Sequence, residues 1–339
     1  MRRIVLVFAA LALAASTAPA ALAAGASFAL RPVKYDPKIP ASASYFIFRV
    51  AGGEAIESEV SVVNTGTKAG TAFLYPVDAT TGQTSGTVYL ARTSKRRDVG
   101  RWVKLGLSRL TLGPGESRVV RFVLHVPRGA RRGDHVGGIV AENAELQTSG
   151  RVASGKGKGG FQIRVRQLTI VGVEVQLPGG KARLKIGAVR GGGQDHHQAV
   201  LFTLKNLGGV LLKPTGTLTV SHGGKVVKRV RLSLDSVLAG TRIDYPAYLA
   251  GKPLSPGTYR VHIWLAYGRH GRVTADRTLK IGARDIVQVY GAKADGFQPQ
   301  RTSKGTLLPW LMAFTALLVA TGAVATTIRV SRRHGDPRS

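Results

Sequence analysis

Hydrophobic and polar residues alternate along most of the chain between Phe28 and Ile281, and turn residues interrupt this alternation at short intervals. A period of two is typical of β-strands that have one face in a core. No segment of this region keeps the 3.6-residue spacing of an amphipathic helix. Short strands with turn signals about every 8–12 residues are typical of β-sandwiches. The pattern therefore predicts an all-β fold.

The predicted strands fall into two groups, which Pro178-Gly179-Gly180 separates. The strands of the first group are 56–64, 72–77, 102–112, 118–126, 135–145 and 161–177. The strands of the second group are 182–189, 199–206, 216–222, 225–232, 258–267 and 272–281. Each group is long enough to build its own core. We therefore predict two tandem Ig-like β-sandwich domains, at 24–178 and 179–282, and one C-terminal transmembrane helix.

Three segments between the strands have turn or loop composition. Residues 78–86 are polar and rich in turn formers, and His222-Gly223-Gly224 is typical of a hairpin turn. Residues 147–160 are rich in Gly, Ser and Lys. This last segment lacks the helix and the Ser or Thr that follow the lysine of a phosphate-binding loop, so we interpret it as a mobile hairpin loop.

The two ends of the chain predict export and anchoring. Arg2 and Arg3 precede the apolar run 4–15, and Ala21-Leu22-Ala23 resembles a cleavage site, so residues 1–23 read as a signal peptide. Residues 305–328 carry no charge and are long enough as a helix to cross a hydrocarbon core of about 30 Å; the alternative is a buried core helix.

Arginines follow this predicted span at once, which marks its cytoplasmic side. We therefore predict a single-pass protein of the cell membrane. Its two domains and a juxtamembrane stalk at 283–304 lie outside the cytoplasm, and a basic tail at 329–339 lies inside.

The charge is large and positive, with 49 Lys and Arg against 18 Asp and Glu. Without the predicted signal peptide and tail, a charge of about +26 remains on the exported part, which favours anionic partners. The export signal argues against nucleic acid and favours a cell wall polymer, either peptidoglycan or an anionic glycopolymer. The alternative is an ordinary solvated surface. The chain has no cysteine, so disulfides and thiolate chemistry are excluded.

Two basic segments are the candidate ligand-binding sites, because arginine and lysine suit phosphate and carboxylate groups. Their residues are Lys95, Arg96, Arg97 and Arg101 in the first segment and Arg128, Arg131 and Arg132 in the second. Trp102 follows the first segment and either stacks on a sugar or fills the core; the alternating strand that it opens favours the core. For both segments the alternative is a solvated loop.

Catalysis has little support in the sequence. The chain has no G-x-S-x-G or H-E-x-x-H motif, and the acidic residues form no suggestive cluster. The pair His196-His197 lies in a Gly-rich turn, where a solvated turn is favoured over a metal site. We therefore expect no enzyme activity, no cofactor and no metal.

The first group of strands resembles the peptidoglycan-binding domain of the WxL-interacting proteins of Gram-positive bacteria. The similarity covers about residues 27–177. It rests on the order of Ser27-Phe28, Tyr45-Phe46-Ile47, Val60-Ser-Val-Val-Asn-Thr-Gly66, Trp102-Val-Lys-Leu105, Leu112-Gly-Pro-Gly-Glu116, Val126-Pro127 and Gly133-Asp-His-Val-Gly-Gly-Ile-Val140. The resemblance implies attachment to the wall and a surface-protein partner with a WxL domain. The second domain and the anchor match that family in position only.

Two hypotheses of function follow. The favoured one is a membrane-anchored, non-catalytic envelope protein that binds wall polymer or a surface protein. The alternative is a chaperone-like or accessory subunit of an envelope assembly or secretion system, which presents an open sheet edge to a client strand. A wall-processing enzyme is a third and weaker possibility.

Overall fold

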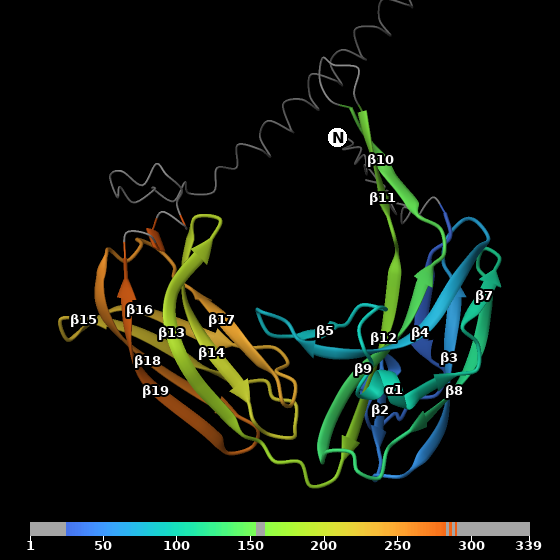
Figure 1. Ribbon diagram of the computed structural model, residues 1–339, viewed down its shortest axis with the longest axis horizontal. Coiled ribbons are helices and arrows are strands. Elements are labelled where there is room, and N and C mark those ends of the chain that lie inside the picture. Colours follow the sequence, from blue (N-terminus) through green and yellow to red (C-terminus); the bar gives the residue numbers. More distant parts are fainter. Residues whose placement is uncertain (1–24, 154–159, 283–284, 287–288, 290–339) are drawn as a thin grey trace, which may run out of the picture.

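The computed structural model describes residues 25–153 and 160–282, together with Asp285, Ile286 and Val289. These residues fold into two β-sandwiches, which confirms the prediction of an all-β fold. Figure 1 shows the first sandwich in blue and green beside the second in yellow and orange. The segment after Leu177 connects them, and the break predicted at 178–180 lies within it.

One sheet of the first sandwich has four strands in the order β1-β3-β8-β6. The strands are β1 (Phe28–Pro32), β3 (Ala55–Asn64), β8 (Ser117–His125) and β6 (Val103–Leu105). All three pairings in this sheet are antiparallel. The predicted strands 56–64 and 118–126 are confirmed to within one residue at each end, and β8 alternates between buried and less buried positions from Val120 onward.

The opposite sheet has the order β2-β12-β9-β4-β5, with β7 also paired to β4. The strands are β2 (Phe46–Arg49), β12 (Leu168–Leu177), β9 (Gly133–Asn143), β4 (Gly70–Thr81), β5 (Thr87–Tyr89) and β7 (Arg109–Leu112). The 3-10 helix η1 (Pro40–Ala43) leads the chain from β1 in the first sheet to β2 in this one. β2 pairs with β12 in parallel and covers only its second half, from Val173 to Gln176.

A hairpin projects from this sheet beyond the body of the sandwich (Figure 1). It consists of β10 (Gln147–Ala153) and β11 (Gly160–Val165), which continue the directions of β9 and β12. The interpretation of 147–160 as a loop is therefore wrong for the residues of β10. Pairing with β11 makes a strand of a segment whose own composition favours a loop. Residues 154–159 lie outside the described part of the chain.

Two other predictions about the first sandwich are wrong. The single strand predicted at 102–112 is split into the short helix α1 (Val99–Trp102), β6 and β7, because the chain crosses from one sheet to the other after Leu105. The loop predicted at 78–86 begins as strand, because β4 continues to Thr81 and pairs there with β5. Thr81 and Ser85 of this arm form hydrogen bonds with the second sandwich rather than facing a core.

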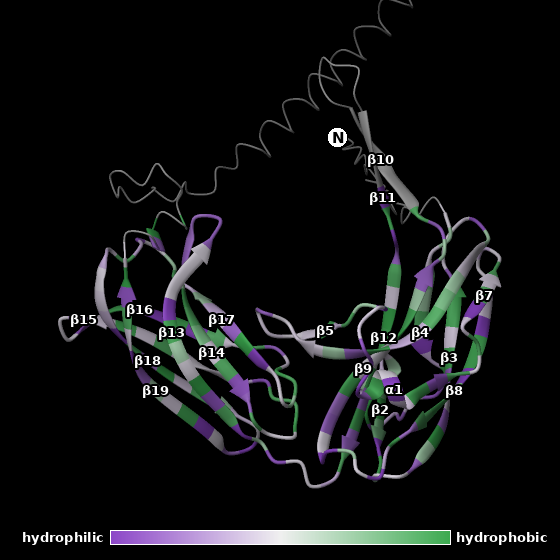
Figure 2. Cartoon of the chain, in the orientation of Figure 1, coloured by the Kyte–Doolittle hydropathy of each residue, from purple (hydrophilic) through white to green (hydrophobic). Residues whose placement is uncertain are grey.

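The core of the first sandwich follows the alternation seen in the sequence. Val120, Phe122 and Leu124 of β8 are buried, and the ring of Phe46 meets that of Phe122 edge-on with 5.1 Å between centroids. Figure 2 shows the same alternation as green and purple bands along the strands. Trp102 is only 6% exposed and belongs to this core, so the interpretation of Trp102 as a core residue is confirmed.

The second sandwich packs a three-stranded sheet, β13-β14-β17, against a four-stranded sheet, β16-β15-β18-β19. The strands are β13 (Leu184–Gln194), β14 (His197–Asn206), β17 (Arg242–Tyr248), β16 (Lys225–Ser233), β15 (Thr215–His222), β18 (Gly257–Tyr267) and β19 (Gly271–Ile281). Sequence analysis missed β17, which contains Pro246. The hairpin turn is confirmed: Gly223 and Gly224 both have positive φ between β15 and β16, as such a two-residue turn requires.

Each sandwich contains a buried asparagine at the end of a strand. The amide of Asn64 donates to the carbonyl oxygens of Lys68 and Leu112, and its oxygen accepts the N–H groups of Ser27 and Gly66. Asn206 bonds in the same way to the carbonyl oxygens of Val210 and Val237 and to the N–H of Gly208. Buried polar groups of the backbone need such partners, so each asparagine ties a strand end to the neighbouring loops.

The two sandwiches touch at the β4–β5 arm. The Thr81 hydroxyl lies 2.7 Å from that of Thr241 and accepts the N–H of Leu238. The N–H of Gly86 also donates to the carbonyl of Ser236 at 2.9 Å. These contacts are polar, and the two apolar cores remain separate.

A second contact lies at the start of β9. The carboxylate of Asp134 accepts the N–H of Leu211 at 2.7 Å, and the N–H of Asp134 donates to the carbonyl of Gly209. The backbones come so close here that a Cβ on Gly133 would fall 2.0 Å from the oxygen of Gly209. Burial raises the pKa of Asp134 although the bond from Leu211 opposes this.

Several predictions concern residues outside the described part of the chain: the signal peptide at 1–23, most of the stalk, the span at 305–328 and the tail at 329–339. No helix among the described residues has the length and hydrophobicity needed to cross a membrane. Ile286, which falls within the predicted stalk, is buried in the core of the second sandwich.

Candidate functional site

The first half of β12 has a free backbone edge. Its neighbour β9 pairs along the whole strand, whereas β2 begins only opposite Val173. The carbonyl of Gln167 accepts the N–H of Asn143 on the β9 side, and the carbonyl of Gln176 accepts the N–H of Val50 on the other side. Backbone N–H and C=O groups alternate in direction along a strand. The N–H and C=O groups of Leu168 and Ile170 therefore point away from β9. No strand of the described chain pairs with them there.

The side chains along this free edge are apolar and exposed. Leu168 is 49% exposed and Ile170 is 37% exposed, while Thr169 and Val171 turn inward. Val165 and Leu146, at the base of the β10–β11 hairpin, are exposed as well. These four residues gather where the hairpin leaves the sheet, so backbone hydrogen-bonding capacity and apolar side chains coincide at one edge.

Other sheet edges of the chain carry features that oppose strand pairing. β16 presents Lys225, Lys228, Arg229 and Arg231. The carbonyls of Ile186 and Gly187 on β13 accept hydrogen bonds from the guanidinium of Arg277. β5 and β6 have only three residues each. Charge, capping and shortness are the usual protections of an edge strand, and residues 168–172 have none of them.

A platform of two glycines lies at the lower end of the free edge. Gly138 of β9 and Gly172 of β12 face each other in the ladder. The Tyr89 ring lies across both, since an added Cβ would fall 2.8 Å from its Cε1 at Gly138 and 2.7 Å from its hydroxyl at Gly172. Tyr45, directly before β2, lies on the other side of Gly172. Glu174, two residues further along β12, lines the same hollow as both tyrosines.

A buried carboxylate fixes the upper end of the same sheet face. Glu142 of β9 accepts hydrogen bonds from the Tyr75 hydroxyl at 2.6 Å and from Arg166 at 2.5 Å, and the guanidinium of Arg92 lies 3.8 Å away. Arg92 also stacks on the rings of Phe73 and Tyr75. Burial by itself would raise the pKa of Glu142, but these bonds and positive charges outweigh burial and lower it. The cluster anchors Arg166 between β11 and β12.

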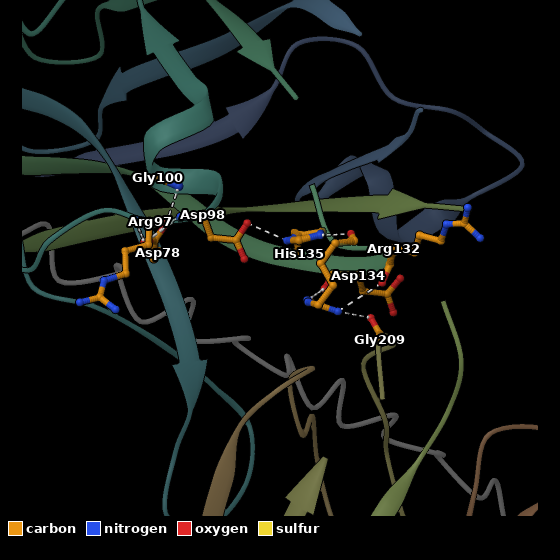
Figure 3. A network of polar contacts seen from close by, with 9 residues as sticks. Asp78, Arg97, Asp98, Gly100, Arg132, Asp134, His135 and Gly209 are labelled. Atoms are coloured by element: carbon orange, nitrogen blue, oxygen red, sulfur yellow. Dashed lines mark hydrogen bonds and ion pairs between the residues drawn. The ribbon is translucent and has the colours of Figure 1, made fainter. Parts of the chain in front are cut away.

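The first predicted basic segment is a loop with a fixed backbone (Figure 3). The buried carboxylate of Asp78 accepts the N–H groups of Arg97, Asp98 and Gly100. Lys95, Arg97 and Arg101 are exposed and Arg96 is half-buried. Basic side chains in solvent are therefore held on a rigid backbone. Figure 3 shows the Arg97 side chain pointing away from the network.

The second predicted basic segment is joined to the first through His135. One ring nitrogen of His135 lies 2.7 Å from the Asp98 carboxylate, and the other lies 2.6 Å from the Arg131 carbonyl. The Arg131 guanidinium donates to the carbonyl oxygens of Gly209 and Asp134, so it holds the two sandwiches together. Arg132 packs against Gly179.

The structure therefore joins the backbones of the two basic segments but does not gather their side chains. Arg97 and Arg132 point in opposite directions in Figure 3. Arg128 lies over the turn at Gly52 and Gly53. The sequence analysis missed the free edge of β12 and the tyrosines beside it. The alternation of Leu168 and Ile170 with inward residues was visible, but the lack of a partner on the outer side of β12 depends on where β2 begins.

The described residues contain no group of three or more His, Asp or Glu side chains that suits a metal ion. His196 lies in a turn with positive φ, and the adjacent His197 bonds to the backbone of Asp195. The favoured interpretation of this pair as a turn agrees with these positions.

The fold and this edge define a protein of two β-sandwiches in which residues 168–172 of β12 pair with a strand on one side only. No family model matches the chain, and no curated protein matches it. The resemblance to the WxL-interacting proteins therefore stays a prediction.

Among solved structures, the chain is similar to the class 5 fimbriae chaperone CfaA, with 11% identity, a TM-score of 0.36, and coverage of 76% of this chain and 100% of that one. A chaperone–tip adhesin complex of CFA/I fimbriae gives 10% identity, a TM-score of 0.37, and coverage of 74% and 98%. The CsuC–CsuE complex of Acinetobacter baumannii gives 13% identity and a TM-score of 0.35, and the match covers 76% of this chain and 100% of that one. These identities and scores are too low to transfer a function.

Proposed function

We propose that this chain is a non-catalytic, chaperone-like or accessory protein of the cell envelope that binds an extended apolar segment of another protein along the free edge of β12. The single observation that carries the proposal is the stretch from Leu168 to Gly172, which combines unpaired backbone groups with exposed apolar side chains. Addition of a strand satisfies backbone groups of this kind, and alternate side chains then give specificity.

The occupant that suits this edge best is a strand with apolar residues at alternate positions. Such a strand would cover Leu168 and Ile170 and continue the sheet in line with β2, which occupies the remaining half of the same edge. A second copy of the chain is the competing occupant. The edges of β16 and β13 argue against it, because the first is charged and the second is capped by Arg277.

Amide hydrogen exchange on the full chain, purified in detergent, tests the geometry first. The amides of Leu168 and Ile170 should exchange rapidly, whereas those of Thr169 and Val171, which face β9, should be protected. Twelve-residue peptides selected from a displayed random library should then protect Leu168 and Ile170 when they bind. Selected peptides that leave both amides unprotected would overturn the proposal, as would a sedimentation measurement that shows the edge filled by a second copy.

Two variants sharpen the test. Ile170→Lys places a charge on the open edge and should weaken peptide binding at least about tenfold, because edge charges oppose strand addition. Val226→Lys makes the same change on the exposed part of β16 and is the matched control, with unchanged binding expected. Thermal unfolding of both variants checks that neither change disturbs the fold.

The location of the protein belongs to the same proposal. The predicted signal peptide and the arginines after Ile328 support an ectodomain outside the cytoplasm and a C-terminus inside. Protease added to intact, wall-stripped cells should remove both sandwiches and spare the tail. Full protection of the sandwiches would contradict this topology.

Binding of wall polymer remains a second candidate. The observation that favours it is the rigid support of the first basic loop, which displays Lys95, Arg97 and Arg101 to solvent. Peptidoglycan or an anionic glycopolymer would be held there by exposed charges alone, and its dependence on salt separates this mode from strand addition.

A further inference from the structure

The lower end of the free edge opens into a small hollow between the two sandwiches. Tyr45, Tyr89 and Glu174 line it from the first sandwich, and Leu211, Lys213 and Ser236 line it from the second. Its volume of about 230 Å³ is below the usual range for small-molecule pockets, which begins at about 300 Å³. The hollow therefore suits one side chain of a bound segment rather than a free ligand.

The sequence of the strands is adapted to this hollow. Glycine is the residue type that leaves room for Tyr89 at positions 138 and 172, since a Cβ would fall 2.8 Å from the ring at Gly138 and 2.7 Å from the hydroxyl at Gly172. The ring therefore lies flat on the sheet, and its hydroxyl reaches the strand at the residue where the free edge ends. We call Tyr45, Tyr89 and Glu174 the tyrosine cleft.

The charge in the tyrosine cleft is opposite to that of the protein as a whole. Glu174 accepts a hydrogen bond from Gln176 at 2.7 Å, and no Lys or Arg of the described residues lies within ion-pair distance of it. Lys213 lines the hollow, but its ammonium group is 3.8 Å from the carboxylate of Asp235. Burial raises the pKa of both Tyr45 and Tyr89, and the negative charge of Glu174 adds to this effect.

A carboxylate beside two aromatic rings is an arrangement that binds cations. Ammonium and guanidinium groups are attracted to the faces of tyrosine rings and form charge-assisted hydrogen bonds with a carboxylate. An acidic group in the hollow would instead be repelled by the negative charge of Glu174. The hollow lies next to Gly172, so a strand on Leu168 and Ile170 would deliver its terminal side chain there.

We propose that the tyrosine cleft receives a lysine or arginine side chain of the segment that binds to the free edge of β12. This inference rests on the proposed function and adds the identity of one residue in the partner. Because the chain carries a net charge of +31, general electrostatics disfavour basic partners. A preference for a basic residue would therefore have to come from a local site.

The test selects peptides from the displayed random library on the full chain, without bias toward charge. Enriched peptides should combine alternating apolar residues with a lysine or arginine at one fixed distance from them. Glu174→Gln should lower the affinity of a synthetic enriched peptide about tenfold, and replacement of its basic residue by norleucine or citrulline should do the same. Glu57→Gln removes one negative charge from an exposed position on β3 and should have no effect.

The outcomes separate this inference from the proposed function. Peptides that protect Leu168 and Ile170 but show no fixed basic residue, or bind Glu174→Gln as well as the parent chain, overturn the inference and leave the proposed function in place. Loss of binding on acetylation of the peptide N-terminus would assign the cation to an α-amino group and also overturn it. If no peptide protects the amides of Leu168 and Ile170, the inference and the proposed function both fail. Tyr89→Phe keeps the ring on its glycines and should retain most of the affinity, whereas Tyr89→Leu should lose it.

Discussion

The two sandwiches share their structural devices and differ in their edges. Asn64 and Asn206 make equivalent hydrogen bonds at equivalent strand ends. Yet β16 in the second sandwich carries four basic residues along its edge, whereas residues 168–172 of β12 carry none. The same scaffold is thus protected against strand addition in one domain and left open to it in the other.

The largest expected effects come from the two cores. Trp102→Ala and Phe202→Ala should each lower the free energy of unfolding by about 3–5 kcal/mol, because each empties a large buried site. Hydrogen exchange of the full chain should show lost protection mainly in the sandwich that carries the change, since the contacts between the sandwiches are polar and few. Equal loss in both sandwiches would show that they unfold as one unit.

The buried asparagines provide the next comparison. Asn64→Ala and Asn206→Ala should each cost about 2–3 kcal/mol, because several buried backbone groups lose their partners. Urea denaturation measures both. The variants Asn64→Asp and Asn206→Asp keep the side-chain oxygen that accepts hydrogen bonds and lose the N–H groups that donate them. An effect below about 0.5 kcal/mol for either alanine variant would show that the two sites are not equivalent.

Each sandwich also has an acidic residue with a lowered pKa. For Glu142 burial opposes the shift, and the bonds from Tyr75 and Arg166 produce it; for Asp244 the hydrogen bond from Thr203 is the main cause. A lowered folded pKa gives stability that is present above the unfolded pKa and lost as pH falls through the folded one.

Wild-type stability should therefore fall as the pH drops below about 4.5, and Glu142→Gln should make this fall shallower. Asp244→Asn should have a smaller effect, because the side chain of Asp244 is 38% exposed whereas that of Glu142 is 4% exposed. Denaturant titrations between pH 3 and 7 measure both, and an unchanged pH profile in Glu142→Gln would contradict the assignment.

The smallest effect on stability is expected at the first basic loop. Neutral replacement of Lys95, Arg96, Arg97 and Arg101 together should change the free energy of unfolding by less than about 0.5 kcal/mol, because exposed charges contribute little to folding. If the loop binds anionic wall polymer, the same change should weaken that binding, and rising salt should weaken it further. Wall binding that is unchanged by the four replacements and by rising salt would exclude the loop as a site.

The sequence by itself determined the all-β class and most of the strands, because burial on one face of a sheet imposes a period of two on residues such as Val120, Phe122 and Leu124. It also placed Trp102 in the core. It did not predict that 102–112 would divide between two sheets or that 147–153 would form a strand. Local composition does not record which strands become neighbours.

Only the tertiary structure decided the candidate site. Leu168 and Ile170 alternate with inward residues like any half-buried strand, and nothing near them in sequence shows that β2 begins only opposite Val173. Gly138 and Gly172 are far apart in the chain, and their shared role under Tyr89 exists only in the register of β9 with β12. Strand pairing joins residues that are distant in sequence, so an unpaired edge is a property of the whole sheet and not of the strand that carries it.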